Sequence, residues 1–253
     1  MEEFYGNEAQ LLRVYGFLKN PYKSLLVIHG ASGSGVTHLL NACGKETEKR
    51  NKKAIYLTAE WFTEIIRSKS KEEQKKEFYE QLSSFDLVCV DNIQFFYRKK
   101  KSITLDLIEL SNYLLKSGKK IIFGCSKLGY DITRSKKINW PGESIRVQLS
   151  PLAGLTVFKL LKRLCTPEDK IPDSLLFLIS GYNASIEQYI NCLISIRFKS
   201  RINNIDLLSL TIEELEIEFR IKNYFPQQQL RKSFMQSSLH FISTIKQSKN
   251  LKT

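Results

Sequence analysis

The sequence contains no apolar run that approaches the ~20 residues a membrane-spanning helix needs. Its first residues, Met1 to Phe4, have neither the basic stretch nor the apolar stretch of a secretory signal peptide. It has no Cys-x-x-Cys pair, and its 5 cysteines are odd in number and lie among apolar neighbours. These absences argue against a membrane anchor, a disulfide framework and a cysteine-ligated metal. We therefore expect a cytoplasmic protein, or one associated with the nucleoid, with reduced thiols in its core.

Acidic residues are also in deficit. The chain has 39 Lys and Arg against 26 Asp and Glu, which gives a formal net charge of +13. A charge of this sign favours a polyanionic partner, and nucleic acid is the more typical one; an anionic membrane surface is the lesser alternative. A lysine-rich proteome would produce the same excess, so charge alone does not establish a partner.

Short apolar runs alternate with helical patterns over the first 150 residues, which predicts a parallel, doubly wound α/β sheet. The expected strands are 25–29, 54–57, 85–91, 119–126 and 146–149, and the expected helices are 5–20, 37–49, 60–84 and 103–115. From residue 156 the strands stop, and short helices are expected at 157–164, 173–180, 185–198 and 205–219. We divide the chain into an α/β core (1–153), a small all-α lid (154–219) and a C-terminal amphipathic helix or tail (220–253), whose helix is expected at 227–247.

A glycine-rich turn follows the first expected strand, with the spacing Gly-x4-Gly-x-Thr of a phosphate-binding P-loop. In such a loop the backbone N–H groups bind phosphate oxygens, and the hydroxyl of the Ser or Thr holds Mg²⁺. The candidate phosphate-binding residues are Gly30, Ser32, Gly33, Ser34, Gly35, Val36, Thr37 and His38. Val36 occupies the position of the motif's lysine, so the loop keeps its backbone cradle without its charge. Asp91 ends the third strand, where we expect it one strand away and able to hold a metal together with Thr37.

Several segments resemble, in the right order, the AAA+ domain of the bacterial replication initiator DnaA and of its short relative Hda. They are the P-loop with its continuation to Ala42, the segment Tyr56–Phe62 and the segment Val90–Phe96. Phe4–Glu8 and Ser150–Leu152 extend the resemblance, which reaches about residue 215. It implies a P-loop AAA+ core with a helical lid, ADP or ATP with Mg²⁺ as a possible cofactor, and a role in initiating chromosomal replication.

The residues that do the chemistry in this family are nearly all altered. Besides Val36, the acid that polarises the attacking water is replaced by Asn92, and Ser126 falls at the sensor of the γ-phosphate. Lys137 falls at the arginine finger, which would lie at a partner interface, and Glu187 aligns with the nucleotide-contacting arginine of the lid. Phosphoryl transfer depends on positioned charge, so these changes together predict no ATP hydrolysis, and no catalytic residue is assigned. Nucleotide binding by the backbone cradle and a nucleotide-free scaffold are both left open.

Two features bear on the subgroup. The residues after about 215 are too few for the helix-turn-helix domain of DnaA, which makes the ending resemble Hda. The insert between Tyr56 and Asp91 has the length found in DnaA, where it lines a channel for single-stranded DNA. This resemblance, with the basic and aromatic composition, suggests nucleic-acid contacts by Lys69, Lys71, Lys75, Lys76, Phe78 and Tyr79. Other basic groups at 98–101 and 116–120 are expected at opposite edges of the sheet, and a solvated face is the favoured interpretation of each single cluster.

The favoured hypothesis is a non-hydrolysing DnaA-related protein that regulates or assists replication initiation by binding DnaA, another initiation protein, or DNA (single-stranded or nonspecific). One alternative is a weak ATP- or ADP-dependent switch, or a helicase-loader-like ATPase, that uses Thr37 and Asp91. Another is a degenerate AAA+ interaction scaffold. The sliding clamp is not an expected partner, because residues 229–234 imitate a clamp-binding peptide poorly.

Overall fold

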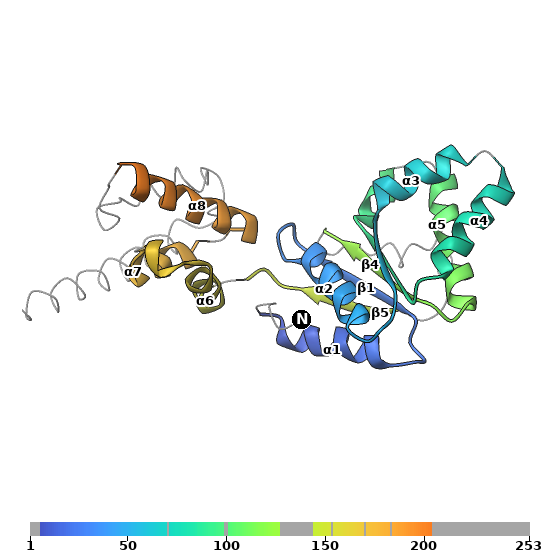
Figure 1. Cartoon of the computed structure of the whole chain (residues 1–253), viewed down its shortest axis with the longest axis horizontal. Helices are drawn as coiled ribbons and strands as arrows, with labels where there is room; N and C mark the ends of the chain where they lie inside the picture. Colours follow the sequence, from blue (N-terminus) through green and yellow to red (C-terminus); the bar gives the residue numbers. More distant parts are fainter. Residues whose placement is uncertain are drawn as a thin grey trace, which may run out of the picture. The chain divides into compact units, whose positions relative to one another are not determined.

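The structure, a computed structural model, describes residues 6–69, 71–98, 101–126, 144–152, 154–169, 171–182 and 184–203 (Figure 1). The chain divides into two compact units, Met1–Pro151 and Leu152–Thr253. Lys137 and the helices expected at 205–219 and 227–247 lie outside the described residues.

The first unit is built on a five-stranded sheet with the order β2-β3-β4-β1-β5, in which every pairing is parallel. The strands are β1 (Leu25–Gly30), β2 (Ala54–Thr58), β3 (Leu87–Asp91), β4 (Lys120–Cys125) and β5 (Ile145–Leu149). This confirms the predicted parallel α/β sheet. The expectation that Asp91 lies one strand from the glycine turn is wrong, because β4 lies between β1 and β3. Parallel strands are joined by crossovers, so the order along the chain does not set the order in the sheet.

Helices cover both faces of this sheet, as side-chain alternation along the strands requires (Figure 1). Leu26 and Ile28 of β1 pack with α1 (Glu8–Lys19) and α2 (Val36–Glu48). Leu25 and Val27 point to the other face, which is covered by α3 (Ala59–Ser68), α4 (Glu72–Ser83) and α5 (Lys101–Lys116). The first unit therefore has two apolar cores with the sheet between them.

The single helical pattern expected over 60–84 is two helices, α3 and α4. Thr58 begins α3, because its Oγ1 accepts a hydrogen bond from the backbone N of Trp61 at 3.2 Å. Phe62 of α3 packs against Phe78 of α4 with ring centroids 6.4 Å apart, and edge-on against Phe96 at 6.0 Å. Phe96 belongs to a short 3-10 helix, η1 (Ile93–Arg98), which follows β3. These aromatic contacts hold the insert onto the α5 side of the sheet.

The described part of the second unit contains helices and no strand: α6 (Leu155–Leu164), the 3-10 turn η3 (Pro167–Asp169), α7 (Asp173–Ser180) and α8 (Ile186–Asn203). A capping box begins α8, since Gln188 N donates to Ser185 Oγ at 3.2 Å and Ser185 N to Gln188 Oε1 at 2.8 Å. The buried carboxylate of Asp169 accepts from the guanidinium of Arg197 at 2.7 Å, which ties η3 to α8. The expected small helical lid is thus an all-helical unit over these residues.

No helix among the described residues combines the length and the apolar character needed to cross a membrane. All five cysteines are free. Cys43, Cys89, Cys125 and Cys192 are buried, and Cys165 is half-buried.

Candidate functional site

The glycine turn lies at the carboxyl end of β1, immediately before α2. Gly33 and Gly35 have φ values of 76° and 92°, which glycine adopts without the steric cost that a Cβ brings. Ser34 N donates to Ala31 O at 3.0 Å, which closes the turn. The first N–H groups of a helix have no acceptor within that helix, so the turn and the start of α2 form the backbone cradle that binds phosphate oxygens in P-loops.

Gly30 leaves room inside this turn for the side chain of Ser34. A Cβ at Gly30 would collide with Ser34 Oγ and would lie 3.0 Å from Leu149 O. Ser34 is 2% exposed, and its Oγ has no hydrogen-bond partner among the described residues. A buried hydroxyl without a partner is costly, so the loop has an unused hydrogen-bonding capacity beneath the cradle. The cradle and this hydroxyl together suit a phosphate-bearing ligand.

Val36 packs into the apolar core, so its side chain provides no charge for a ligand of this turn. Its side chain is 3% exposed and belongs to the core cluster that contains Leu39 and Leu149. A lysine at this position would extend an ammonium toward bound phosphates. The valine instead stabilises the first turn of α2 by burying its side chain, which contributes about 1.5–3 kcal/mol relative to exposure.

Asp91 is the polar centre of the site. It ends β3, is completely buried, and accepts hydrogen bonds on both carboxylate oxygens. Thr37 Oγ1 and Tyr56 OH donate to Oδ2 at 2.6 Å and 2.7 Å, and the backbone N of Asn92 donates to Oδ1 at 2.8 Å. The two residues expected to hold a metal, Thr37 and Asp91, are therefore in direct contact.

Gly124 explains how this contact spans the intervening strand. Gly124 lies on β4 between β3 and β1, and a Cβ there would lie 2.5 Å from Asp91 Oδ1 and 2.9 Å from Leu40 Cδ2. Only a residue without a side chain leaves room for the carboxylate to meet α2 across β4.

Tyr56 is a residue of this site that sequence reasoning missed. It lies on the edge strand β2, and the parallel register places Thr58 beside Asp91. Burial raises the pKa of Tyr56 well above its usual value, and the hydrogen bond and the charge of Asp91 raise it further. Tyr56 therefore remains a hydroxyl that donates to Asp91 at every physiological pH. Its signal in the sequence is only an aromatic residue in a short strand, which is typical of any sheet.

Asn92 and Ser126 are joined through a second missed residue, Gln94. Asn92 adopts a left-handed φ of 59°, and its Oδ1 accepts from Gln94 Nε2 at 3.1 Å. Gln94 Oε1 accepts from the backbone N of Ser126 at 3.3 Å. The neutral amide of Asn92 is thus linked through the amide of Gln94 to the residue that follows β4.

The other predicted residues of the nucleotide site are placed as follows. Ser32, Gly33, Thr37 and His38 are exposed around the mouth of the turn. Glu187 is exposed in the first turn of α8, in the second unit, and Lys137 lies outside the described residues. No group of three or more His, Cys, Asp and Glu side chains in the described ranges could hold a metal ion. A Mg²⁺ would therefore take few ligands from the protein, here Thr37 and Asp91, and the rest from phosphate and water.

The insert departs from the nucleic-acid site that the sequence suggests. Phe78 and Tyr79 are 6% and 4% exposed and belong to the core under α5, so their rings are not available to stack on bases. The predicted nucleic-acid contacts of Phe78 and Tyr79 are therefore wrong, because both residues lie on the side of α4 that packs into the core. Tyr79 OH also donates to Asp106 O at 3.2 Å.

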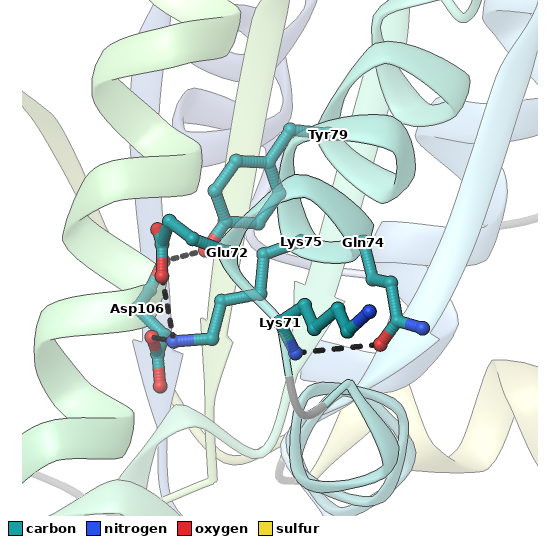
Figure 2. Close-up of polar contacts among 6 residues, drawn as sticks. All are labelled: Lys71, Glu72, Gln74, Lys75, Tyr79 and Asp106. Atoms are coloured by element: carbon teal, nitrogen blue, oxygen red, sulfur yellow. Dashed lines mark hydrogen bonds and ion pairs between the residues drawn. The ribbon is translucent and has the colours of Figure 1, made fainter.

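Lys75 is also engaged within the protein. Figure 2 shows its Nζ reaching from α4 to Asp106 of α5, 2.8 Å from Oδ1, with Glu72 at 3.7 Å. The hydrogen bond to Asp106 raises the pKa of Lys75. Of the six candidates in the insert, Lys71 and Lys76 are exposed and Lys69 is half-buried, so the insert presents less of a binding surface than its composition suggests.

Comparisons with known proteins bear on these observations. Residues 12–137 match a family described as the bacterial DnaA ATPase domain. The chromosomal replication initiator protein DnaA of Helicobacter hepaticus is 33% identical over 102 residues, which are 40% of this chain and 22% of that protein. The DnaA of Borrelia garinii is 32% identical over 119 residues, 46% of this chain and 24% of that protein. The match thus spans less than a quarter of the length of these curated relatives.

Solved structures share the fold at low identity. Domain III of the Thermotoga maritima replication initiation protein DnaA has a TM-score of 0.66 at 18% identity, covering 88% of this chain and 96% of that chain. AMPPCP-bound DnaA from Aquifex aeolicus has a TM-score of 0.59 at 18% identity, covering 97% of this chain and 89% of that chain. Likeness at this level of identity shows the α/β AAA+ fold.

Proposed function

We propose that this chain, whose residues 12–137 match the family described as the bacterial DnaA ATPase domain, is a DnaA-like AAA+ protein that takes part in replication initiation by binding nucleotide without hydrolysing it. In this role it would regulate or assist the initiator through contacts with DnaA, with another initiation protein, or with DNA. The observation that carries the proposal is the pairing of an intact cradle and Thr37–Asp91 contact with a core-bound Val36.

Binding and hydrolysis place different demands on the site. Binding of phosphate uses backbone N–H groups and the helix N-terminus, and the glycine conformations that orient them are present. Hydrolysis needs charge at the positions where it develops in the transition state, and removing one such donor typically costs a factor of about 10²–10³ in rate. Val36 and Asn92 remove two charged groups at once.

Thr37 and Asp91 also fit Mg²⁺, although each is already partnered. Mg²⁺ would neutralise part of the phosphate charge and orient the phosphates. Thr37 Oγ1 would turn from Asp91 to the ion, and Asp91 would keep Tyr56 and Asn92 as donors. Support from relatives comes from the AMPPCP present in solved DnaA structures, one of which also contains single-stranded DNA.

Calorimetry with ADP and ATP, each with and without Mg²⁺, tests the nucleotide part of the proposal. We expect wild-type protein to bind nucleotide, Gly33→Val to lose binding because of its positive φ, and Thr37→Ala to lose only the increment due to Mg²⁺. In a separate assay with ATP, the wild-type protein should release no more phosphate than the Thr37→Ala variant. If the wild type releases phosphate and Thr37→Ala does not, the ATPase alternative is correct. If calorimetry detects no heat of binding at high micromolar nucleotide, the chain is the nucleotide-free scaffold.

The role in initiation needs a separate measurement. Tagged wild-type protein should retain purified DnaA from the same source, or shift DNA at low salt, and Gly33→Val should change that binding if nucleotide controls it. A protein that binds neither DnaA nor DNA under these conditions has no role of the proposed kind.

A further inference from the structure

The edge of the sheet opposite the glycine turn gathers four separate segments. Parallel strands all begin at the same edge, so the segments preceding β1, β2, β3 and β4 meet there. Backbone hydrogen bonds place them in a row: Leu87 N donates to Lys53 O at 3.1 Å, Lys120 N to Asp86 O at 3.0 Å, and Ile121 N to Ser24 O at 2.8 Å. Residues 19–24, 45–53, 84–86 and 116–120 make up what we call the amino-edge surface.

This surface is strongly basic. Its four segments contain ten Lys and Arg: Lys19, Lys23, Lys45, Lys49, Arg50, Lys52, Lys53, Lys116, Lys119 and Lys120. They contain three carboxylates, Glu46, Glu48 and Asp86. Glu46 is paired with Arg50 at 3.0 Å, and Asp86 accepts from the backbone N of Lys53 at 2.9 Å, so two of the three are already engaged. Lys49, Lys52 and Lys53 are exposed.

The fold brings these charges close together. Lys19 of α1 and Arg50, which follows α2, both lie over the ring of Tyr15, at 4.4 Å and 5.1 Å from its centroid. Lys120 Nζ donates to the carbonyl oxygens of Phe17 and Asn20 at 2.6 Å and 2.5 Å. Burial, together with the nearby charges of Lys52 and Arg50, lowers the pKa of Lys120 to about 8. The four segments therefore share one field of positive potential.

An aromatic ring projects from the same surface. Tyr22 is 90% exposed and stands in the connection between Lys19 and Lys23. Its backbone N donates to Asn20 Oδ1 at 2.8 Å, which holds the turn that presents the ring. Proteins hold single-stranded nucleic acids through phosphate contacts to basic groups and through bases stacked on aromatic side chains. A solvent-facing ring among lysines provides both.

We propose that the amino-edge surface binds single-stranded nucleic acid, with the exposed lysines of residues 49–53 on its phosphates and one base stacked on Tyr22. An anionic membrane is less well matched, because Tyr22 is the one large exposed apolar side chain of these segments, and membrane binding needs a larger apolar face. The surface is separate from the nucleotide site at the other edge, so it does not rest on the nucleotide-binding proposal.

Fluorescence anisotropy of the full chain with labelled oligothymidylate and oligouridylate tests the proposal. The triple variant K49E/K52E/K53E should bind at least about tenfold more weakly. The slope of log affinity against log salt should also become shallower by about two, because each of the three lost phosphate contacts contributes about 0.7. Tyr22→Ala should lose about fivefold or more and Tyr22→Phe should retain binding, because stacking uses the ring and not the hydroxyl.

The matched control is K69E/K71E/K76E, which makes the same change in net charge within the insert. A loss in this control as large as that in the amino-edge triple variant would overturn the proposal, as would equal losses in Tyr22→Ala and Tyr22→Phe. Anionic vesicles form another arm: if the amino-edge variants lose vesicle binding but keep oligonucleotide binding, the surface binds membranes instead. Calorimetry with ADP on the triple variant should match wild type, which separates this result from any failure at the nucleotide site.

Discussion

Asp91→Asn changes one oxygen of the buried carboxylate that joins β3 to α2 and β2. In the wild type this carboxylate accepts three hydrogen bonds, from Thr37, Tyr56 and the backbone N of Asn92. The N–H of Asn92 can only donate, so the amide oxygen of the variant must take the Oδ1 position. Its NH₂ group then faces the hydroxyls of Thr37 and Tyr56, which can rotate and accept.

The cost follows from what each bond becomes. Hydrogen bonds to a charged group contribute about 1.5–3 kcal/mol, and neutral ones about 0.5–1.5 kcal/mol. All three bonds change from the first class to the second, and each loses about 1 kcal/mol, so the free energy of unfolding should fall by about 3 kcal/mol. Asp91→Ala leaves the buried N–H of Asn92 without an acceptor as well, and its loss should reach about 3–5 kcal/mol.

Urea unfolding followed by tryptophan fluorescence measures this loss where it occurs, because Trp61 lies on α3, in the same unit as Asp91. Glu80→Gln removes the same charge from an exposed position of α4 and should change stability by less than about 0.5 kcal/mol. Ultraviolet titration, with Tyr56→Phe as the reference, adds a second readout. The pKa of Tyr56 should fall in Asp91→Asn but stay above its usual value, because burial is the larger cause. Equal stability of Asp91→Asn and Glu80→Gln, with an unchanged Tyr56 titration, would refute this account of the site.

Three further predictions concern packing and charge. Gly124→Ala should lower the melting temperature and reduce the free energy of unfolding by about 1–3 kcal/mol, because its Cβ would press on Asp91 and Leu40. Gly16→Ala is the control: a Cβ there meets nothing within 4 Å, so the variant should raise the free energy of unfolding by about 0.5–1 kcal/mol through a more stable α1. Lys75→Met should lower the free energy of unfolding, measured in urea, by about 1–2 kcal/mol near neutral pH. The hydrogen bond to Asp106 raises the pKa of Lys75 in the folded protein. The full difference between wild type and variant should therefore be present below the unfolded pKa of ~10.4 and should disappear as the pH rises through the folded pKa. Asp169→Asn should increase amide hydrogen exchange in α8 by about 100-fold at neutral pH, equivalent to about 3 kcal/mol. Burial opposes ionisation of Asp169, but bonds from Thr166 and Arg197 lower its pKa on balance, so its stabilisation is present above ~3.9 and is lost as the pH falls through the folded value.

Much of the fold could be predicted because its signals are local. Apolar runs located all five strands of the described sheet, and helical periodicity located the described α-helices, apart from the division between α3 and α4; the 3-10 helices η1 and η3 were not predicted. The glycine spacing predicted a turn that Gly33 and Gly35 adopt with positive φ. The absent lysine needs no structure to be recognised, because Val36 has no charge in any conformation.

Predictions about neighbours were weaker. The basic and aromatic composition of the insert predicted nucleic-acid contacts by Phe78 and Tyr79, but both side chains pack in the core with residues of α5. Tyr56 and Gln94 contact the site through hydrogen bonds to residues 35 and 32 positions away, and a short strand or turn carries no sign of such a partner.

The order of the elements, the glycine turn after β1 and the absence of a charge at Val36 could all be read from the amino-acid sequence, since each depends on residues close together in the chain. Three features became visible only in the folded chain: β4 separates β1 from β3, Gly124 lets Thr37 reach Asp91 across it, and ten scattered basic residues share one edge. The physical reason is that crossovers between parallel strands set which segments become neighbours, and only neighbours can share a hydrogen bond or a field.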